Sequence, residues 1–473
     1  MPMKHTYILT LLALSSSLFA SAYTLPDELR ETGLRTLVVE TVDGEEPEGE
    51  SIKAPAGCWG VGLTNVNKVP GSLVILNPDG SVDFESGEYV KKESGMTIKL
   101  RGNTSAQYPK KPYKIKLEKK GDLLCRGDKS LNDKNWVLLT VRYNLLELGF
   151  LLGKWIGMPF APEYEYVNLV LNGEYRGVYT LAESVERNEK CRIITNETGF
   201  ITEKDCYWWN ENGEYFNSIW STGFNWTMKY PDFEDMTDEQ KDYLQEMVTK
   251  FEEIIQTEQY DEFIDVDSFA RWLIVHDILG TGDGGGTNFF LAKYDNTPET
   301  KLFVPVVWDT DSGMETEDKF SAVQRQWSTY YAFENTNPAL KNKYIEIYRQ
   351  LGDELYDRLD AYTAELLSGE GWEGYDKAAA LNNDIWGENN QYSALLNGKD
   401  MEWWFPARKL WHDAVVAELE ATSAIGQPTV ETAQPADISV FTIDGVRVYY
   451  GPRDGFRPSS KGIYIVDGKK ISL

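Results

Sequence analysis

Four side chains with oxygen donors stand in one short segment of the sequence. They are Asp283, Asn288, Asp309 and Asp311. Residues 288–294 and 302–308 have strand patterns joined by a polar turn. An antiparallel hairpin with Tyr294 opposite Leu302 would place the start of the first strand beside the end of the second. The four side chains would then meet at one end of a sheet. Carboxylate and amide oxygens are the ligands that Mg²⁺ and Mn²⁺ prefer, so the segment predicts a divalent metal site.

The order of these side chains is also the order found in the catalytic centres of kinases. There, one aspartate accepts the proton of the substrate hydroxyl, a following asparagine holds a metal ion, and a later aspartate links the metal to the phosphates. Asp283 would take the first of these roles. The alternative is a flexible glycine-rich loop with solvated acids, because an Asp-x4-Asn pattern is short.

The composition limits the chemistry. The chain of 473 residues has 47 Lys and Arg against 75 Asp and Glu, a formal net charge of −28, and only three histidines. This excess of acid argues against nucleic-acid binding, which needs Lys and Arg to neutralise phosphates. His276 falls on the apolar face of an expected helix, so we interpret it as a core residue. The proton acceptor is then expected to be a carboxylate.

Transfer of a phosphoryl group also needs cations over the phosphates. Arg101 precedes a run of lysines that leads into a strand pattern at residues 113–117. In this strand Lys114 and Lys116 share one face and the apolar side chains share the other. The lysine face either contacts phosphates or is simply exposed to solvent.

The N-terminus has the pattern of an export signal. Residues 7–19 form an apolar run that is too short to span a bilayer, and an Ala-Ser-Ala run ends at Ala22. We expect residues 1–22 to be a signal peptide and the mature protein to be secreted or held at the cell surface. No later stretch has the pattern of a membrane span. The four cysteines allow three disulfide pairings, among which the sequence does not choose.

The rest of the chain divides into segments of different pattern. We expect a small β region at residues 23–95, a main domain of helices and strands at 96–420, a linker at 421–437 and a short β tail at 438–473. Inside the main segment, Asn172-Gly173 between two apolar runs predicts a β-hairpin. Thr237 and Gln240 form a capping box that predicts the start of a helix.

Six stretches of the main segment stand in a familiar order. They are RGNTSAQYPKKPYKIKL, KNWVLL, APEYEYVNLVLNGEYRGVYTLAESV, GFITEKD, MKYPDF and VPVVWDTD. This order resembles the CotH kinase family, the spore-coat-protein-H-like atypical protein kinases, strongly from about Leu100 to Asp311 and weakly to about Glu420. The resemblance implies an α+β fold class with a divergent two-lobed protein-kinase-like domain. It also implies a protein Ser/Thr kinase that uses ATP with Mg²⁺ or Mn²⁺.

The resemblance also implies roles for single residues. Asp283 matches the family's active-site aspartate and Asp309 the metal-binding aspartate of its Trp-Asp motif, with Asn288 and Asp311 as further metal ligands. Five residues are expected to contact or support the nucleotide: Arg101, Lys111, Lys114, Glu183 and Glu203. Lys111 is the first choice for the phosphates and Lys114 the second. Glu183 is expected to orient that lysine, and Glu203 to lie near the adenine.

The sequence departs from the family at two places. Ser312-Gly313-Met314 stands where the family usually has an aromatic–glycine pair, and the family's usual pair of Asp and Arg is not evident in residues 141–148. The alternative is therefore a catalytically silent pseudokinase that acts as a structural or glycan-binding surface protein. Its candidate glycan platforms are tryptophans, namely Trp208, Trp209, Trp220, Trp226, Trp403 and Trp404. A large aromatic core would explain them equally.

The tail has a resemblance of its own. DGVRVYYG and GIYIVDGKKISL resemble the C-terminal sorting tails of type IX secretion substrates. The resemblance implies that the secretion machinery is a partner of this tail. The alternative is a small terminal β module packed on the main domain.

Overall fold

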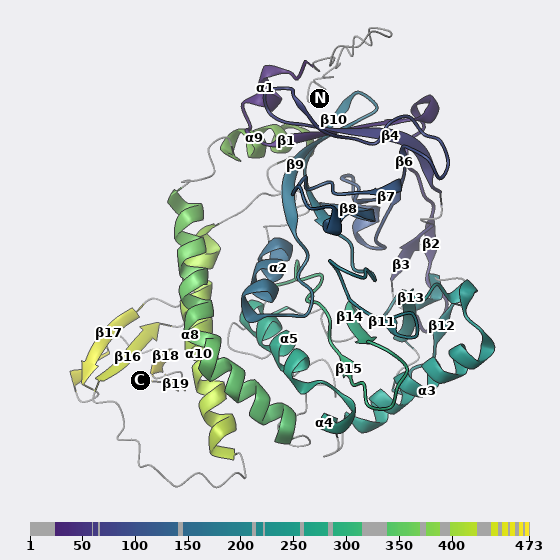
Figure 1. Ribbon diagram of the computed structural model, residues 1–473. Helices are drawn as coiled ribbons and strands as arrows, with labels where there is room; N and C mark the ends of the chain where they lie inside the picture. Colours follow the sequence, from purple (N-terminus) through teal and green to yellow (C-terminus); the bar gives the residue numbers. More distant parts are fainter. Residues whose placement is uncertain are drawn as a thin grey trace.

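The computed structural model describes residues 24–58, 60–64, 67–140, 145–210, 214–220, 223–255, 260–281, 287–314, 338–368, 375–387, 398–422, 437–442, 447–452, 455–458, 463–466 and 469–472. The mixture of helices and strands fits the predicted α+β class. Figure 1 shows strands of the N-terminal half curled into a barrel, with two long helices to one side of the molecule.

Seven strands close on themselves into a barrel-like sheet. They are β1 (Arg35–Thr41), β4 (Val69–Leu76), β6 (Met96–Leu100), β7 (Tyr113–Gly121), β8 (Asp133–Thr140), β9 (Tyr164–Leu171) and β10 (Glu174–Glu183). The strand order is β1-β9-β10-β8-β7-β6-β4, and β4 pairs back with β1 to complete the ring. β1 lies parallel to β9, and the other neighbouring strands are antiparallel. A short strand, β5 (Val82–Glu85), extends the sheet from β4.

The residue patterns explain which side of each strand the barrel buries. On β7, Tyr113, Ile115 and Leu117 pack inside the barrel, and the lysines between them face outward. Asn172 and Gly173 have positive φ angles and form the predicted hairpin turn between β9 and β10. The predicted boundary at residue 95 is wrong, because β1 and β4 lie before it and belong to the barrel.

A second sheet has five antiparallel strands in the order β12-β13-β11-β14-β15. Their bounds are β11 (Phe200–Asp205), β12 (Tyr215–Phe216), β13 (Asn225–Tyr230), β14 (Phe289–Lys293) and β15 (Leu302–Phe303). β14 and β15 are the predicted hairpin, but its register is shifted by one residue, with Lys293 opposite Leu302. β15 is short because its backbone groups bond to residues at the start of helix α5 (Val266–Leu279). Leu302 O accepts from Asp265 N at 2.7 Å, and Val304 N donates to Ser268 Oγ at 3.0 Å.

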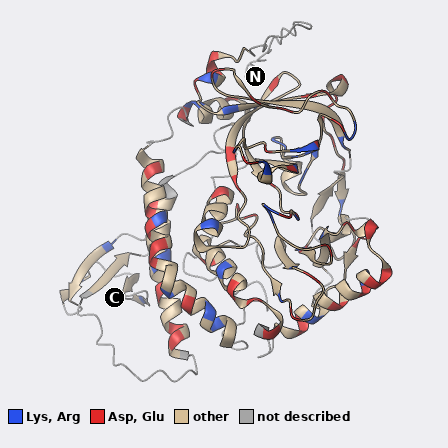
Figure 2. Ribbon diagram, viewed as in Figure 1, with Lys and Arg blue, Asp and Glu red and all other residues tan. Residues whose placement is uncertain are grey.

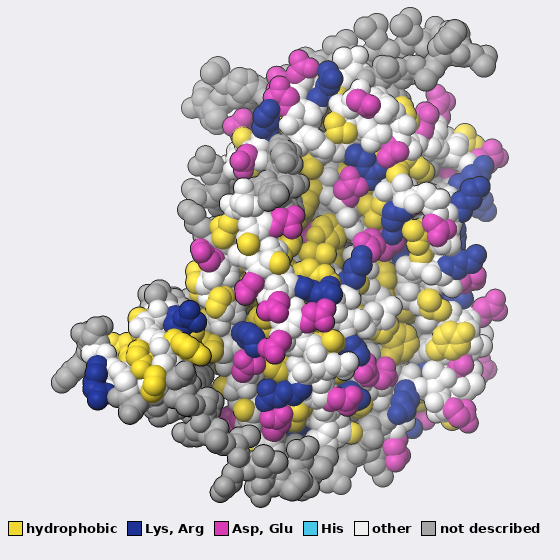
Figure 3. Space-filling model, turned by 60° about the vertical axis from the view of Figure 1, so that its left-hand side comes forward, with side chains coloured by type: hydrophobic (Ala, Val, Ile, Leu, Met, Phe, Trp, Pro, Cys, Tyr) yellow, Lys and Arg dark blue, Asp and Glu magenta, His cyan; other side chains and the backbone are white. Residues whose placement is uncertain are grey.

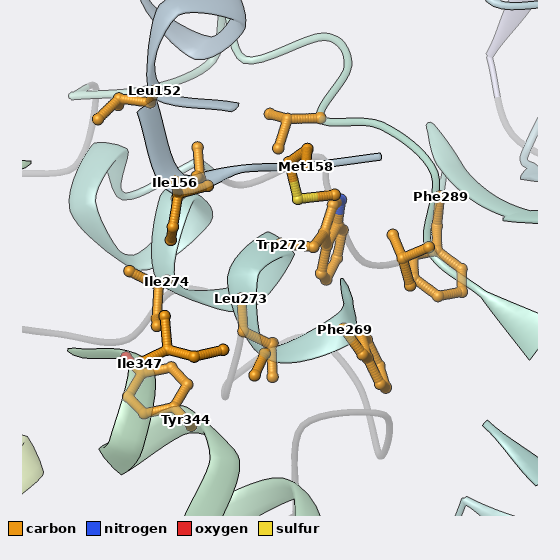
Figure 4. Close-up of a cluster of buried hydrophobic side chains, with 14 of the residues drawn as sticks. Leu152, Ile156, Met158, Phe269, Trp272, Leu273, Ile274, Phe289, Tyr344 and Ile347 are labelled. Atoms are coloured by element: carbon orange, nitrogen blue, oxygen red, sulfur yellow. The ribbon is translucent and has the colours of Figure 1, made fainter. Parts of the chain in front are cut away.

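The longer helices pack around one extensive apolar core. They are α2 (Leu145–Ile156), α3 (Asp238–Ile254), α5 (Val266–Leu279), α8 (Pro338–Ser368), α9 (Tyr375–Trp386) and α10 (Gly398–Thr422). Figure 4 shows side chains of α2, α5 and α8 meeting Met158 and Phe289 in this core. α3 begins at the predicted capping box of Thr237 and Gln240. His276 of α5 is fully buried, which confirms its interpretation as a core residue.

The remaining short elements are α1 (Asp27–Arg30), α4 (Tyr260–Phe263), and a hairpin of β2 (Ser51–Lys53) and β3 (Val61–Leu63). Single 3-10 turns occupy Val42–Gly44, Ser105–Gln107, Lys129–Leu131, Trp208–Asn210 and Phe233–Asp235. Asp and Glu are spaced along the outer helices, with Lys and Arg between them (Figure 2). Among the helices that the structure describes, none is both long and apolar enough to cross a membrane.

The C-terminal tail forms a small antiparallel sheet. Its strands are β16 (Asp437–Thr442), β17 (Arg447–Pro452), β18 (Ile463–Val466) and β19 (Lys469–Ser472), in the order β17-β16-β18-β19. The sequence predicted the first three strands and missed the fourth. The sheet has an apolar core of its own, which includes Ile438, Val440 and Tyr464. It protrudes from the surface in Figure 3, and the side chain of Tyr450 on its edge strand is 66% exposed.

Candidate active site

The turn at residues 309–311 is held between two helices. Thr310 is buried, and its Oγ1 donates to the backbone oxygen of Leu145 at the start of α2, 2.7 Å away. The backbone nitrogen of Met314 donates to the oxygen of Leu279, the last residue of α5, at 2.8 Å. The two acidic side chains of this turn are therefore carried by a backbone that both helices fix.

The contact between α2 and this turn depends on a glycine. A Cβ atom on Gly149 would lie 2.2 Å from Thr310 Oγ1, whereas a Cβ on Gly153 of the same helix would meet its nearest neighbour at 3.6 Å. We expect Gly149→Ala to lower the free energy of unfolding by about 1–3 kcal/mol, because the new methyl group overpacks the contact. Gly153→Ala is the matched control and should raise it by up to about 1 kcal/mol through helix propensity. Urea unfolding measures both, and equal effects of the two variants would contradict this account.

Arg101 connects the barrel to the turn. It directly follows β6, and burial lowers the pKa of its guanidinium. Three nearby negative charges oppose that shift: Asp309, Glu203 and Asp311. The Arg101 Cζ also lies 5.7 Å from the centroid of the Trp308 ring. The structure thus brings together four of the residues that the sequence predicted for metal and nucleotide.

Lys114 lies near Arg101 on the outer face of β7. Its register partner on β8 is Val137, whose side chain belongs to an apolar cluster outside the barrel. Burial lowers the pKa of Lys114, and the negative charge of Glu186 opposes this shift. The positive charges of Lys229 and Arg101 lower the pKa further. Lys114 is therefore a partly desolvated cation in a cluster of charges, as a group that binds phosphate would be.

Two residues of this cluster, Glu186 and Lys229, were missed by sequence reasoning. Lys229 on β13 pairs with Glu203 on β11, with Nζ and Oε2 2.7 Å apart. Both residues had a signal, because Glu186 follows the hairpin motif directly and Lys229 lies inside MKYPDF. What the sequence lacked was the pairing of strands that brings them to Arg101 and Lys114.

Two predicted nucleotide residues lie elsewhere. Lys111 stands before β7 begins, where its Nζ donates to the backbone oxygen of Ala106 at 2.7 Å and its side chain lines a cavity at the end of the barrel. Glu183 forms an ion pair with Arg126, with Oε1 and Nη2 2.9 Å apart. The expectation that Glu183 orients the phosphate-binding lysine is therefore wrong, and Glu186 is the carboxylate beside Lys114.

The remaining metal and catalytic residues are only partly described. Asp283 lies outside the described residues, so its role stays a prediction. Asn288 directly precedes β14 and has a left-handed φ angle of 57°. No group of three or more His, Cys, Asp or Glu with metal-binding geometry occurs among the described residues. The donor set of Asn288, Asp309 and Asp311 consists of hard oxygens only, and its chemistry fits Mg²⁺ or Mn²⁺.

The end of α5, which precedes Asp283 in the sequence, is fixed in place. Trp404 Nε1 of α10 donates to Ile278 O at 3.1 Å. Arg408 Nε of the same helix donates to Asp277 O. Both oxygens belong to the last turn of α5, where carbonyl groups lack partners within the helix. α10 thus anchors the end of α5 from a distant part of the sequence.

A buried carboxyl group on α2 makes stability depend on pH. Glu147 is fully buried, its Oε1 accepts from Thr180 Oγ1, and burial raises its pKa from 4.5 to about 7. The folded protein therefore keeps this proton at pH values where the unfolded chain has lost it. This contribution to stability is fully present below pH 4.5 and is lost as the pH rises through 7.

We expect Glu147→Gln to remove this dependence. At pH 8 the variant should be more stable than the parent by on the order of 2–3 kcal/mol, and near pH 4.5 the two should be similar. Urea unfolding at both pH values measures the difference, and Glu346→Gln, on the exposed face of α8, is the control. A stability gain of the same size at both pH values would show that the charge of Glu147 is not its cause.

Comparison with known proteins places most of these residues within one family match. A family model described as CotH kinase protein matches residues 98–375, which is more than half of the chain. All of the site residues named above except Trp404 and Arg408 lie in this segment, and α10 lies beyond it. No curated protein matches the chain. The chain belongs to the CotH kinase family.

Proposed function

We propose that this chain is an exported atypical protein kinase that transfers the γ-phosphate of ATP to Ser or Thr hydroxyls of a protein, with Mg²⁺ or Mn²⁺. The observation that carries the proposal is the placement of Arg101 and Lys114 with Asp309 and Asp311. A kinase needs cations over the phosphates and carboxylates that hold the metal. Membership of the CotH kinase family supports the same reading. In this proposal the barrel and the helical part are the two lobes of a divergent kinase fold.

The roles of the residues follow from their chemistry. Asn288, Asp309 and Asp311 would hold the metal, which supplies neutralisation of phosphate charge. Lys114 and Arg101 would contact the phosphate oxygens, where partial burial strengthens their attraction. Glu186 would orient Lys114, taking the place first given to Glu183.

The proton of the acceptor hydroxyl needs a base within hydrogen-bond reach. Asp283 is our candidate, because His276 is buried in the core and burial lowers its pKa to about 3. A histidine with that pKa is a weak base that stays neutral at physiological pH. Its buried position keeps it from contact with a substrate. The end of α5, which α10 holds, would fix the point in the chain from which the segment with Asp283 continues.

The proposal is tested on the mature chain from residue 23 onward. With ATP and Mn²⁺ together, the thermal unfolding midpoint should rise, because a ligand that binds only the native state adds to its stability. Radiolabelled γ-phosphate should appear on the protein itself or on a Ser/Thr-rich protein such as casein. ATP with a chelator is the control. Failure of both the midpoint shift and the transfer would overturn the proposal.

The alternative of a glycan-binding surface protein loses two of its candidate platforms. The rings of Trp226 and Trp404 are fully buried, with 0% of each side chain exposed. They serve the core and the end of α5 instead. A pseudokinase would bind ATP without transferring phosphate, and the same pair of measurements distinguishes it from an active kinase.

We also propose that residues 1–22 direct export and that the tail at 438–473 engages the secretion machinery. The exposed edge strand of the tail sheet supports a role in contact with another protein. Fractionation of cells that express the chain with and without the tail tests this. The tail-less chain should remain inside the cell envelope while the full chain reaches the surface or the medium.

A further inference from the structure

A cavity of about 450 Å³ opens at one end of the seven-stranded barrel. Tyr113 from the start of β7 and Tyr179 from β10 reach it from the barrel interior. Arg176 of β10, the loop at Glu46–Glu48 and Trp386 at the end of α9 complete its walls. Its volume is within the range of small-molecule sites in proteins. None of Arg101, Lys114, Asp309 and Asp311 lines it, so it is distinct from the proposed kinase site.

Two tyrosine hydroxyl groups of this cavity make no hydrogen bond with the residues that the structure describes. Tyr113 is 4% exposed and Tyr179 is 1% exposed, and within the described part of the chain neither hydroxyl bonds to another residue, so both are available to a ligand in the cavity that they line. The Nε of Arg176 is buried and likewise lacks an acceptor in the described part of the chain. Buried polar groups are normally paired, because an unpaired one costs free energy. Burial raises the pKa of Tyr113 to about 12, so its hydroxyl remains a donor at neutral pH.

The walls of the cavity are fixed by bonds of their own. Lys110 Nζ lies beneath Tyr179 and donates to Val178 O and to Asn382 Oδ1. Trp386 Nε1 donates to the backbone oxygen of Arg176 at 2.9 Å, which ties α9 to β10. The donors that face the cavity are thus held in place in advance, which is a property of built binding sites.

The charges around the cavity decide the class of ligand. Two positively charged side chains, Lys111 and Arg176, line the cavity together with three carboxylates. The carboxylates are those of Glu46, Glu48 and Glu174. Arg176 Nη2 already pairs with Glu46 at 2.7 Å and with Glu174 at 3.2 Å. An anion would be repelled by the three carboxylates and by the net charge of −28. A cation would meet Lys111 and Arg176 and would leave the unpaired donors without acceptors.

A neutral molecule rich in hydroxyl groups satisfies both sets of side chains. Its oxygens can accept from Tyr113 and Tyr179, and its hydroxyls can donate to Glu48. The rings of the two tyrosines and of Trp386 offer flat apolar surfaces for its carbon skeleton. We propose that the end of the barrel binds a neutral sugar of one or two rings. This site is independent of the proposed kinase activity.

Binding is tested by isothermal titration of the mature chain with sugars of equal size and different charge. The probes are glucose, galactose and maltose as neutral sugars, glucosamine as a cation and glucuronate as an anion. We expect saturable binding of a neutral sugar, with at least about tenfold weaker binding of both charged probes. Preference for a charged probe, or no saturable binding up to about 100 mM of any neutral probe, would overturn the proposal.

Matched variants locate the binding in this cavity. Tyr113→Phe removes one unpaired hydroxyl and should weaken sugar binding about threefold to tenfold, the effect of one hydrogen bond. Because that hydroxyl has no described protein partner, the thermal unfolding midpoint should stay unchanged, so weaker binding cannot come from misfolding. Tyr450→Phe, on the exposed edge of the tail sheet, is the control and should bind like the parent. Unchanged binding in Tyr113→Phe would contradict the proposal.

Discussion

Asp309→Asn is expected to lower the rate of phosphate transfer by on the order of 10³-fold, the size of effect produced by losing a group that stabilises the transferring phosphate. The amide has the size of the carboxylate but lacks the charge that would hold the metal. Asn is the right substitution here because Asp309 has a φ angle of 57°, a left-handed conformation that Asn tolerates well. The turn, with Thr310 bonded to Leu145, should therefore keep its shape.

Initial rates with ATP and Mn²⁺ measure this effect, and the thermal unfolding midpoint without ligands checks that the fold is intact. The control is Asp357→Asn, which removes the same charge from the exposed face of α8. It should transfer phosphate like the parent. A rate for Asp309→Asn within about tenfold of the parent would show that this carboxylate is not a ligand of the catalytic metal, since removal of a single stabilising group costs more than that.

Local signals in the sequence predicted local structure well. The Asn172-Gly173 turn needs only two residues with positive φ, and the capping box at Thr237 and Gln240 needs only the first turn of a helix. The buried position of His276 follows from the spacing of apolar residues along one helix. In each case the interacting groups lie a few residues apart, so the chain itself specifies the contact.

Contacts between distant segments could not be predicted in this way. β1 pairs with β9 across more than a hundred residues, and an alternating strand pattern is the same whichever neighbour a strand takes. The short β15 depends on hydrogen bonds with Asp265, which donates, and with Ser268, which accepts, and no strand pattern contains these bonds. The family resemblance assigned Asp309, Asp311 and Arg101 to one site, and in the structure the two carboxylates lie close enough to Arg101 to affect its pKa. Motif order can group such residues even where strand pairing is unknown.

The assignment of the phosphate-binding lysine changed for the same reason. Sequence reasoning preferred Lys111, whereas the closed barrel places Lys114 on the outer face near Arg101. Lys111 lies at the end of the barrel, bonded to Ala106 O. The alternation of lysines and apolar residues along β7 indicates that its two faces differ. Which face lies near the carboxylates of the site follows only from the closure of the barrel.

Lys114→Met should therefore lower kcat/KM for ATP by about 10²–10³-fold, the effect of removing one preorganised electrostatic contact. Met fills a similar volume without a charge. Burial lowers the pKa of Lys114, so keeping this side chain charged destabilises the folded protein. The variant should thus unfold at the same temperature as the parent or a higher one. Loss of activity then reports on phosphate binding and not on folding.

Lys111→Met is the matched variant and should keep kcat/KM within about twofold of the parent, because a substitution away from the site changes free energies by no more than about 0.5 kcal/mol. Steady-state kinetics over a range of ATP concentrations distinguish the two lysines, and the loss in Lys114→Met should appear in both kcat and KM. The opposite result, with Lys111→Met inactive and Lys114→Met active, would place the phosphates at the end of the barrel. It would also assign the cavity of Tyr113 and Arg176 to the nucleotide, because Lys111 lines that cavity.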